Sequence, residues 1–153
     1  MRRISLVLAL ALAVPASALA QAARLPWTAG DKPPSVAGVK LGDALAAVIH
    51  SLGEPEAVDT LSPGNYSLAW LKRGVSAVVA ERDGVTIVNA TKRAAAELGG
   101  VRVGDTRASV QAKLGTPAKE QGPSWLYEVG AWTVVVQFHA QNDAVVRIGV
   151  GRS

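Results

Sequence analysis

The side chains that could carry out catalysis are few and scattered. The chain has two histidines, His50 and His139, and no cysteine. A histidine base needs a partner within hydrogen-bond reach, and a metal site needs clustered ligands. Neither histidine lies in such a pattern, Ser76 lacks the second glycine of a nucleophile turn, and no glycine-rich phosphate loop is present. The sequence therefore predicts no catalytic residue, no metal site and no cofactor, so we expect the protein not to be an enzyme.

Aromatic residues on predicted strands are the unusual part of the inventory. Every second side chain of a strand points to the same face. Trp132 and Phe138 therefore share a core-facing side with Val134 and Val136. The other strand aromatics are either core residues too, or anchors on a partly open sheet surface, where rings with a polar tip favour protein contacts. The hypothesis of exposed anchors gives the predicted binding residues, which are Tyr66, Trp70, Trp125 and Tyr127.

The elements that must position these side chains are encoded by a sequence repeat. Residues 38–55 and 100–117 are identical at nine of eighteen positions without a gap. Such self-similarity is typical of a duplicated structural unit. A single copy would be marginal as an independent domain, so we expect the two copies to share an interface.

Each copy begins with a predicted helix, over Asp43 to Leu52 and Asp105 to Leu114. The apolar stripe of the first helix repeats at the spacing of one helix face. Asp43 and Asp105 are the predicted N-caps, because a carboxylate there accepts from free backbone N–H groups. Gly53 and Gly115 are the predicted C-caps, each followed by a stopping proline.

Strands follow each helix, separated by turn residues such as Asp83-Gly84 and Gly130-Ala131. The predicted strands are 66–71, 75–81, 85–89, 125–129, 132–138 and 144–150, and a short helix is predicted over 91–98. The predicted fold class is α+β, with two tandem repeats, each a capped helix, preceded by a short helix or loop, packed on a three-stranded antiparallel meander. The two sheets either join edge to edge or stack.

The first twenty residues have the composition of a secretory signal peptide. Arg2 and Arg3 precede an apolar run that is too short to span a bilayer, and the small residues up to Ala20 suit cleavage there. Export by the twin-arginine route is the alternative. We predict a signal peptide over 1–20, a flexible spacer over 21–37, a first repeat over 38–90 and a second over 91–153. The location predicted is periplasmic or secreted.

Charge and cysteine content exclude several partner classes. The net charge is +4, two charges of which belong to Arg2 and Arg3, and no run of like charges exceeds two residues. This pattern argues against nucleic-acid binding. Without cysteine the chain has no disulfide and no cysteine for a lipid anchor, and nothing after residue 20 is apolar enough to predict a transmembrane segment.

The repeated unit, a Gly-Asp start, a helix ending in Leu-Gly-x-Pro and an aromatic strand, resembles a known family. The second copy carries it as Gly104 to Pro117 followed by Trp125-Leu126-Tyr127, and the first as Gly42 to Pro55 followed by Leu68-Ala69-Trp70. It resembles the SmpA/OmlA family, the small component of the outer-membrane β-barrel assembly machinery. It is also similar to the β-lactamase-inhibitor-protein fold, a tandem of such units.

The resemblance implies an exported, non-enzymatic protein-binding module similar to a cell-envelope assembly factor. The expected partner is a protein, of the outer membrane or the cell envelope. Two alternatives stay open, which are an inhibitor of a secreted or periplasmic hydrolase, and a module that binds glycan or peptidoglycan through stacked Trp and Tyr rings.

Overall fold

The computed structural model describes residues 34–93 and 97–153, and the predicted signal peptide lies outside these residues. The order of elements in residues 35–90, two short strands, a helix and four strands, recurs in residues 97–152. We call these the first and the second half. The first half contains β1 (Ser35–Val36), β2 (Val39–Lys40), α1 (Leu45–Leu52), β3 (Ala57–Ser62), β4 (Asn65–Trp70), β5 (Val75–Ala80) and β6 (Gly84–Ala90). The second half contains β7 (Glu97–Leu98), β8 (Val101–Arg102), α2 (Arg107–Leu114), β9 (Lys119–Gln121), β10 (Ser124–Val129), β11 (Trp132–Phe138) and β12 (Val145–Arg152).

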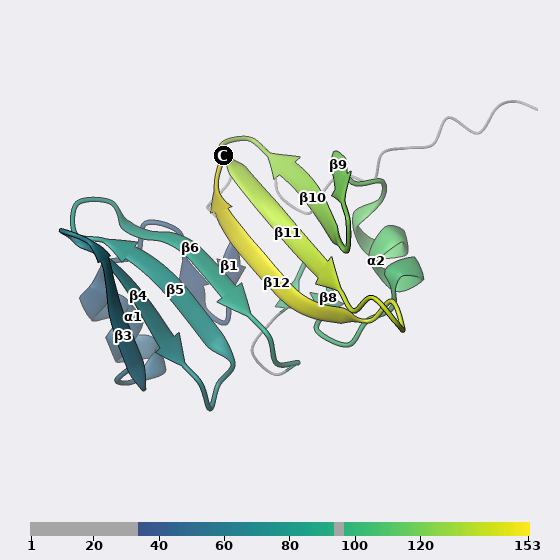
Figure 1. The fold of residues 1–153 in the computed structure, drawn as a ribbon. Helices are drawn as coiled ribbons and strands as arrows, with labels where there is room; N and C mark the ends of the chain where they lie inside the picture. Colours follow the sequence, from purple (N-terminus) through teal and green to yellow (C-terminus); the bar gives the residue numbers. More distant parts are fainter. Residues whose placement is uncertain (1–33, 94–96) are drawn as a thin grey trace, which may run out of the picture.

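A single eight-stranded antiparallel sheet dominates the fold, in the order β3-β4-β5-β6-β12-β11-β10-β9 (Figure 1). The predicted α+β class, with two three-stranded meanders each packed under a helix, is wrong. The described chain is mostly β, and each half contributes four strands to one continuous sheet. The question of whether the sheets stack or join is answered by β6 and β12, which pair edge to edge.

The junction of β6 and β12 aligns the buried side chains of the two halves. Ile148 lies opposite Ala90, and Val150 lies opposite Val88. Following the register from strand to strand gives two buried rows that cross six strands. They are Trp70-Val75-Ala90-Ile148-Val136-Trp125 and Leu68-Ala77-Val88-Val150-Val134-Tyr127, and every member is at most 4% exposed. The two halves therefore share one hydrophobic core.

Both helices and both short hairpins cover that same face of the sheet. Val48 and Leu52 of α1, and Val110 and Leu114 of α2, belong to the buried cluster beneath the rows. The hairpin β1–β2 packs against β6 and β12, below the junction. Val36 of this hairpin is fully buried, so the predicted spacer that ended at residue 37 extends too far into the fold.

The helix starts differ from the prediction. The helices begin at Leu45 and Arg107, and the residues at the N-cap are Ala44 and Thr106. Asp43 and Asp105 instead close the turn that follows the hairpin, where their Oδ2 atoms accept from the backbone N–H of Lys40 and Arg102, each at 2.9 Å. The carboxylate thus satisfies a backbone donor three residues before it, not three after it.

The helix ends agree with the prediction. Gly53 and Gly115 are the C-caps, and their N–H groups donate to the carbonyls of Ile49 and Gln111, each at 2.8 Å. Their backbone angles, φ 83° with ψ −174° and φ 77° with ψ −156°, lie in a region that is open almost only to glycine.

Two kinds of element were not expected, and one predicted helix is wrong. The edge strands β3 and β9 carry no alternation of buried and exposed residues, since nearly all their side chains are exposed. The hairpins β1–β2 and β7–β8 consist of two-residue strands, which give no periodic signal. The helix predicted over 91–98 is wrong at Glu97–Leu98, which form β7, while residues 94–96 lie outside the described part.

The opposite face of the sheet has no helix or hairpin of the described residues over it and faces the viewer in Figure 1. We call it the open face. On it Val78 lies opposite Ile87, and Leu126 lies opposite Val135. Ile87 is 42% exposed and the others are half-buried. An uncovered antiparallel face is ordinarily polar, so these apolar pairs are unusual.

Gly84 joins the β5–β6 turn to the start of α1, and its replacement tests this contact. A Cβ at Gly84, where φ is +71°, would lie 2.5 Å from the carbonyl oxygen of Gly42 and 2.6 Å from that of Asp43. We expect Gly84→Ala to lower the free energy of unfolding by about 3 kcal/mol or more. Gly122→Ala is the control, because φ is also positive but no atom lies within 4 Å; its cost is about 1 kcal/mol. Equal losses in urea denaturation would show that the contact is unimportant.

The turn at Asp105 predicts a pH-dependent stability. Burial alone would raise the pKa of Asp105, but hydrogen bonds from Lys113 and the Arg102 N–H, and the charges of Lys113 and Arg93, hold the pKa below 3.8. A lowered pKa stabilises the fold above pH 3.8, and this contribution fades as the pH falls further. We expect Asp105→Asn to cost about 1–2 kcal/mol at pH 7.

Urea denaturation at pH 7 and pH 3 measures this effect, with Asp43→Asn as the matched variant. Asp43 accepts the same backbone bond, while the Lys113 contact at 2.7 Å belongs to Asp105. The loss in Asp105→Asn should shrink at pH 3 and exceed that of Asp43→Asn at pH 7. A loss that is the same at both pH values contradicts the assignment.

Candidate functional site

Three of the four predicted binding residues lie in the core. Trp70 is 1% exposed, Trp125 4% and Tyr127 3%, whereas Tyr66 is half-buried. Strand parity grouped these side chains correctly, but the face they share is the one that α1, α2 and the hairpins cover. The hypothesis that Trp70, Trp125 and Tyr127 are exposed anchors is therefore wrong. A glycan platform of stacked tryptophans loses its basis for the same reason.

The buried rings tie the sheet to the ends of the helices. Trp70 Nε1 donates to the carbonyl of Gly53 at 2.8 Å, and the Tyr127 hydroxyl donates to the carbonyl of Gly115 at 3.3 Å. Burial, with a smaller contribution from the charge of Glu120, raises the pKa of Tyr127 to about 12. Tyr127 thus remains a protonated donor at physiological pH, and both rings have a structural role.

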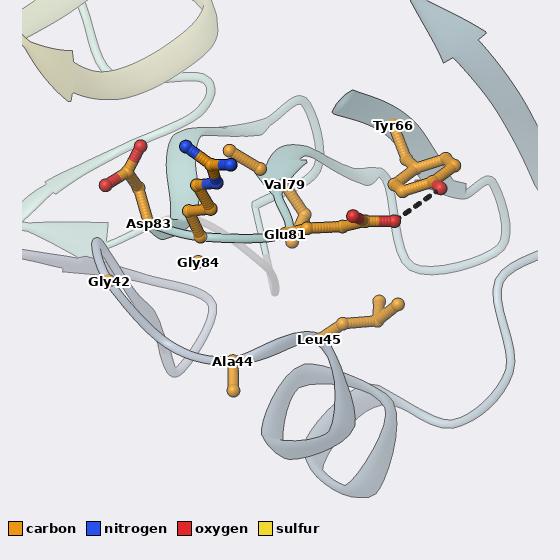
Figure 2. A pocket seen from close by; sticks show the side chains of 10 residues that line it. Gly42, Ala44, Leu45, Tyr66, Val79, Glu81, Asp83 and Gly84 are labelled. Atoms are coloured by element: carbon orange, nitrogen blue, oxygen red, sulfur yellow. Dashed lines mark hydrogen bonds between the residues drawn. The ribbon is translucent and has the colours of Figure 1, made fainter. Parts of the chain in front are cut away.

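Tyr66 lies at a surface pocket between the start of α1 and the turn that joins β5 to β6 (Figure 2). Its volume is about 220 Å³. The lining residues are Gly42, Ala44, Leu45, Tyr66, Val79, Ala80, Glu81, Arg82, Asp83 and Gly84. We call this the α1 pocket. A second hollow of about 440 Å³, lined by residues 63–65 and 80–83, lies on the other side of the same turn.

Carboxylates and an aromatic ring give the α1 pocket its chemistry. The Tyr66 hydroxyl donates to Glu81 Oε1 at 2.8 Å, and Figure 2 shows the Glu81 side chain extending toward the ring. This hydrogen bond, the charge of Glu81 and burial raise the pKa of Tyr66, so the phenol stays neutral. Glu81 and Asp83 supply two negative charges against one positive charge from Arg82, and Leu45 with Val79 supplies an apolar wall.

The corresponding place in the second half is filled by Arg107. Its Nε lies 3.1 Å from Asp143 Oδ1, and its Cζ lies 4.9 Å from the ring centre of Trp125 and 4.3 Å from that of Phe138. The two rings meet edge to face, 4.9 Å between centres. A guanidinium held by one carboxylate and two aromatic rings thus closes this place.

Backbone hydrogen bonds establish which residues correspond. Gly42 N donates to Val85 O and Gly104 N donates to Val145 O, both at 2.7 Å. The strand pairs β5–β6 and β11–β12 each contain a shift of register, at Val78/Val79 and at Gln137/Phe138. The residue after each shift, Val79 or Phe138, pairs with the valine. By this correspondence Leu45 matches Arg107. Asp83 and Asp143 each lie two residues before the valine, but the turn after Phe138 is one residue longer than the turn after Val79. Leu68 and Val79 stand where Trp125 and Phe138 stand in the second half.

Sequence reasoning missed the α1 pocket, apart from Tyr66. Among the other lining residues, Asp83 and Gly84 were predicted only as a turn between strands. The available signal was the mismatch between the repeats, in which Leu45 aligns with Arg107.

Within residues 34–93 and 97–153, no three His, Asp or Glu side chains are close enough together to hold a metal ion. His50 lies in the last turn of α1 and His139 follows β11, so they are in different halves. In the same part of the chain, neither helix is long and apolar enough to cross a membrane. The strongest candidate sites are therefore the α1 pocket and the open face.

Three solved structures are similar to this fold at low sequence identity. An extracellular protein containing an SCP domain from Bacillus anthracis has a TM-score of 0.61 and 13% identity, over 74% of this chain and 44% of its own. A cysteine-rich secretory protein from Staphylococcus aureus has a TM-score of 0.62 and 14% identity, over 82% of this chain and 50% of its own. A DUF4309 family protein from Bacillus subtilis has a TM-score of 0.51 and 14% identity, over 76% of this chain and 83% of its own.

These similarities concern the fold alone. The chain spans half or less of the length of the first two proteins. No family model and no curated protein matches the sequence. None of the three structures is described as an SmpA/OmlA protein or a β-lactamase inhibitor, so that resemblance remains a prediction.

Removing the guanidinium from the second half should open a pocket there. We expect Arg107→Ala to lower the free energy of unfolding by about 1–2 kcal/mol, because it removes ring contacts and an ion pair that is partly exposed. Acrylamide quenching of tryptophan fluorescence should rise, since Trp125 loses its cover. Arg147→Ala, at an exposed position on the open face, is the control and should change neither quantity. Unchanged quenching in Arg107→Ala would contradict the description of Arg107 as a plug.

Proposed function

We propose that the protein is an exported, non-enzymatic module that binds a protein partner through the open face of its sheet. The observation that carries the proposal is two apolar cross-strand pairs, Val78 with Ile87 and Leu126 with Val135, on a face that no helix or hairpin of the described residues covers. Exposed apolar groups of this kind are typical of interaction surfaces. The partner belongs to the cell envelope, as the resemblance to the SmpA/OmlA family implies.

Several observations support this proposal. The pattern of residues 1–20 predicts export, and two proteins of similar fold are described as extracellular or secretory. The rows of the covered face already form a complete core, so the apolar side chains of the open face are available for contact.

Charge placed at the centre of the open face should abolish partner binding. A photoreactive residue at Val78, in cells that export the protein, should give a discrete protein adduct. We expect Ile87→Lys to reduce this adduct at least tenfold, roughly 1.4 kcal/mol of binding free energy, because a buried interface core excludes charge.

Leu71→Lys is the matched control, since Leu71 is 65% exposed and lies in the β4–β5 turn outside the open face. Circular dichroism should show both variants folded. If the adduct is unaffected by Ile87→Lys, or is reduced equally by both variants, the open face is not the binding surface.

A further inference from the structure

The two halves differ at the start of the helix, where the second half holds the Arg107 side chain and the first half has the α1 pocket. The group held in the second half indicates what the pocket could bind. In the second half the place at the helix start holds a guanidinium, in contact with Asp143 and two rings. In the first half an aspartate, Asp83, again lies two residues before the first valine of the next strand, while the arginine is replaced by Leu45. A surface pocket of about 220 Å³ lies beside Leu45, while Leu68 and Val79, the counterparts of the two rings, are each 2% exposed.

We propose that the α1 pocket binds a cationic side chain, arginine or lysine, presented by the protein partner. The inference rests on the proposed function, because the side chain comes from the same partner that covers the open face. The chemistry is that of the filled half, in which a carboxylate faces the charge and rings or apolar groups pack on the stem.

The lining residues divide this task between them. Leu45, which is 36% exposed, offers an apolar surface to the methylene stem. Glu81 brings a carboxylate to the head, beside Tyr66, and Asp83 lies at the other end of the lining (Figure 2). The Tyr66 hydroxyl donates to Glu81 Oε1, which fixes the position of that carboxylate. Arg82 offsets only one of the two negative charges.

The N-terminus of α1 disfavours a bound cation no more than the N-terminus of α2 does. A helix N-terminus carries partial positive charge, which disfavours a nearby cation. Arg107 nevertheless stands at the first position of α2, because Asp143 lies beside it at 3.1 Å. The α1 pocket has two carboxylates, Glu81 and Asp83, in its lining, so the local balance favours a cation at least as much.

The test uses a small probe, so that it is independent of the partner. Nα-acetyl-arginine amide is titrated into the exported protein and followed by amide NMR shifts, with the citrulline analogue as the neutral probe of the same shape. We expect saturable shifts at Leu45, Tyr66 and Glu81 with the arginine probe, and at least tenfold weaker binding of the citrulline probe.

Two variants decide whether the carboxylates and the empty volume are responsible. Glu81→Gln with Asp83→Asn keeps the shape, including an acceptor for Tyr66, and should weaken arginine binding at least tenfold. Leu45→Arg supplies the guanidinium within the chain and should also block the probe. Glu54→Gln removes an exposed carboxylate directly after the C-cap of α1, outside the pocket lining, and should leave binding unchanged.

The results separate this inference from the proposed function. Equal binding of arginine and citrulline, shifts away from the α1 pocket, or no saturable shift overturns the inference, whatever the adduct at Val78 shows. If the probe binds as expected but Leu45→Arg leaves the partner adduct at Val78 undiminished, the pocket does not serve the partner, and the inference also fails.

Discussion

The pairing of β6 with β12 is the constraint on which the rest of the fold depends. It joins two four-stranded groups into one sheet and sets Ile148 opposite Ala90 in a buried row. A slip of one residue would turn every side chain of one half to the other face. The two helices would then lie on opposite sides, and neither would have a complete core. The register also explains the position of the hairpin β1–β2, which packs under both strands of the junction.

Glycines at this junction shape the open face as well. Gly149 and Gly151 of β12 face outward, where the Asn89 side chain of β6 lies over Gly149 and Ile87 packs near Gly151. A side chain on Gly149 would meet the Asn89 carboxamide. The first half therefore extends side chains over the second half at the seam, where the cross-strand neighbours of Ile87 are Val78 and Gly151. Gly149 and Gly151 thus lie at the junction of the two halves and also determine which side chains are exposed on the open face there.

Much of the sheet was predictable because its central strands carry strong local signals. The bounds of β5 and β11 were predicted to within one residue, since alternation and flanking turns both mark them. The edge strands β3 and β9 were not predictable, because their side chains are almost all exposed and follow no pattern. The prediction that Asp43 and Asp105 cap the helices was wrong, because their carboxylates accept from backbone N–H groups of the preceding turn and not of the helix. Local sequence does not distinguish the two directions.

The candidate site needed tertiary information for a different reason. Parity showed that Trp125 and Tyr127 share a face, but which face is covered depends on hairpins too short to predict. The α1 pocket depends on a comparison that becomes meaningful only when the strands are in register. Leu45 and Arg107 differ in sequence without an evident consequence until the rings beneath Arg107 are known.

The open face and the α1 pocket have in common that folding does not require them. The buried rows are complete without Ile87, and the second half shows that the chain can close the pocket with an arginine of its own. An exposed isoleucine lowers solubility, and an unfilled pocket forgoes packing. Such a feature lowers the stability or solubility of the free protein. Binding of a partner that covers the isoleucine and fills the pocket would offset this loss. The same argument does not apply to Trp70, Trp125 and Tyr127, whose burial is needed by the fold itself.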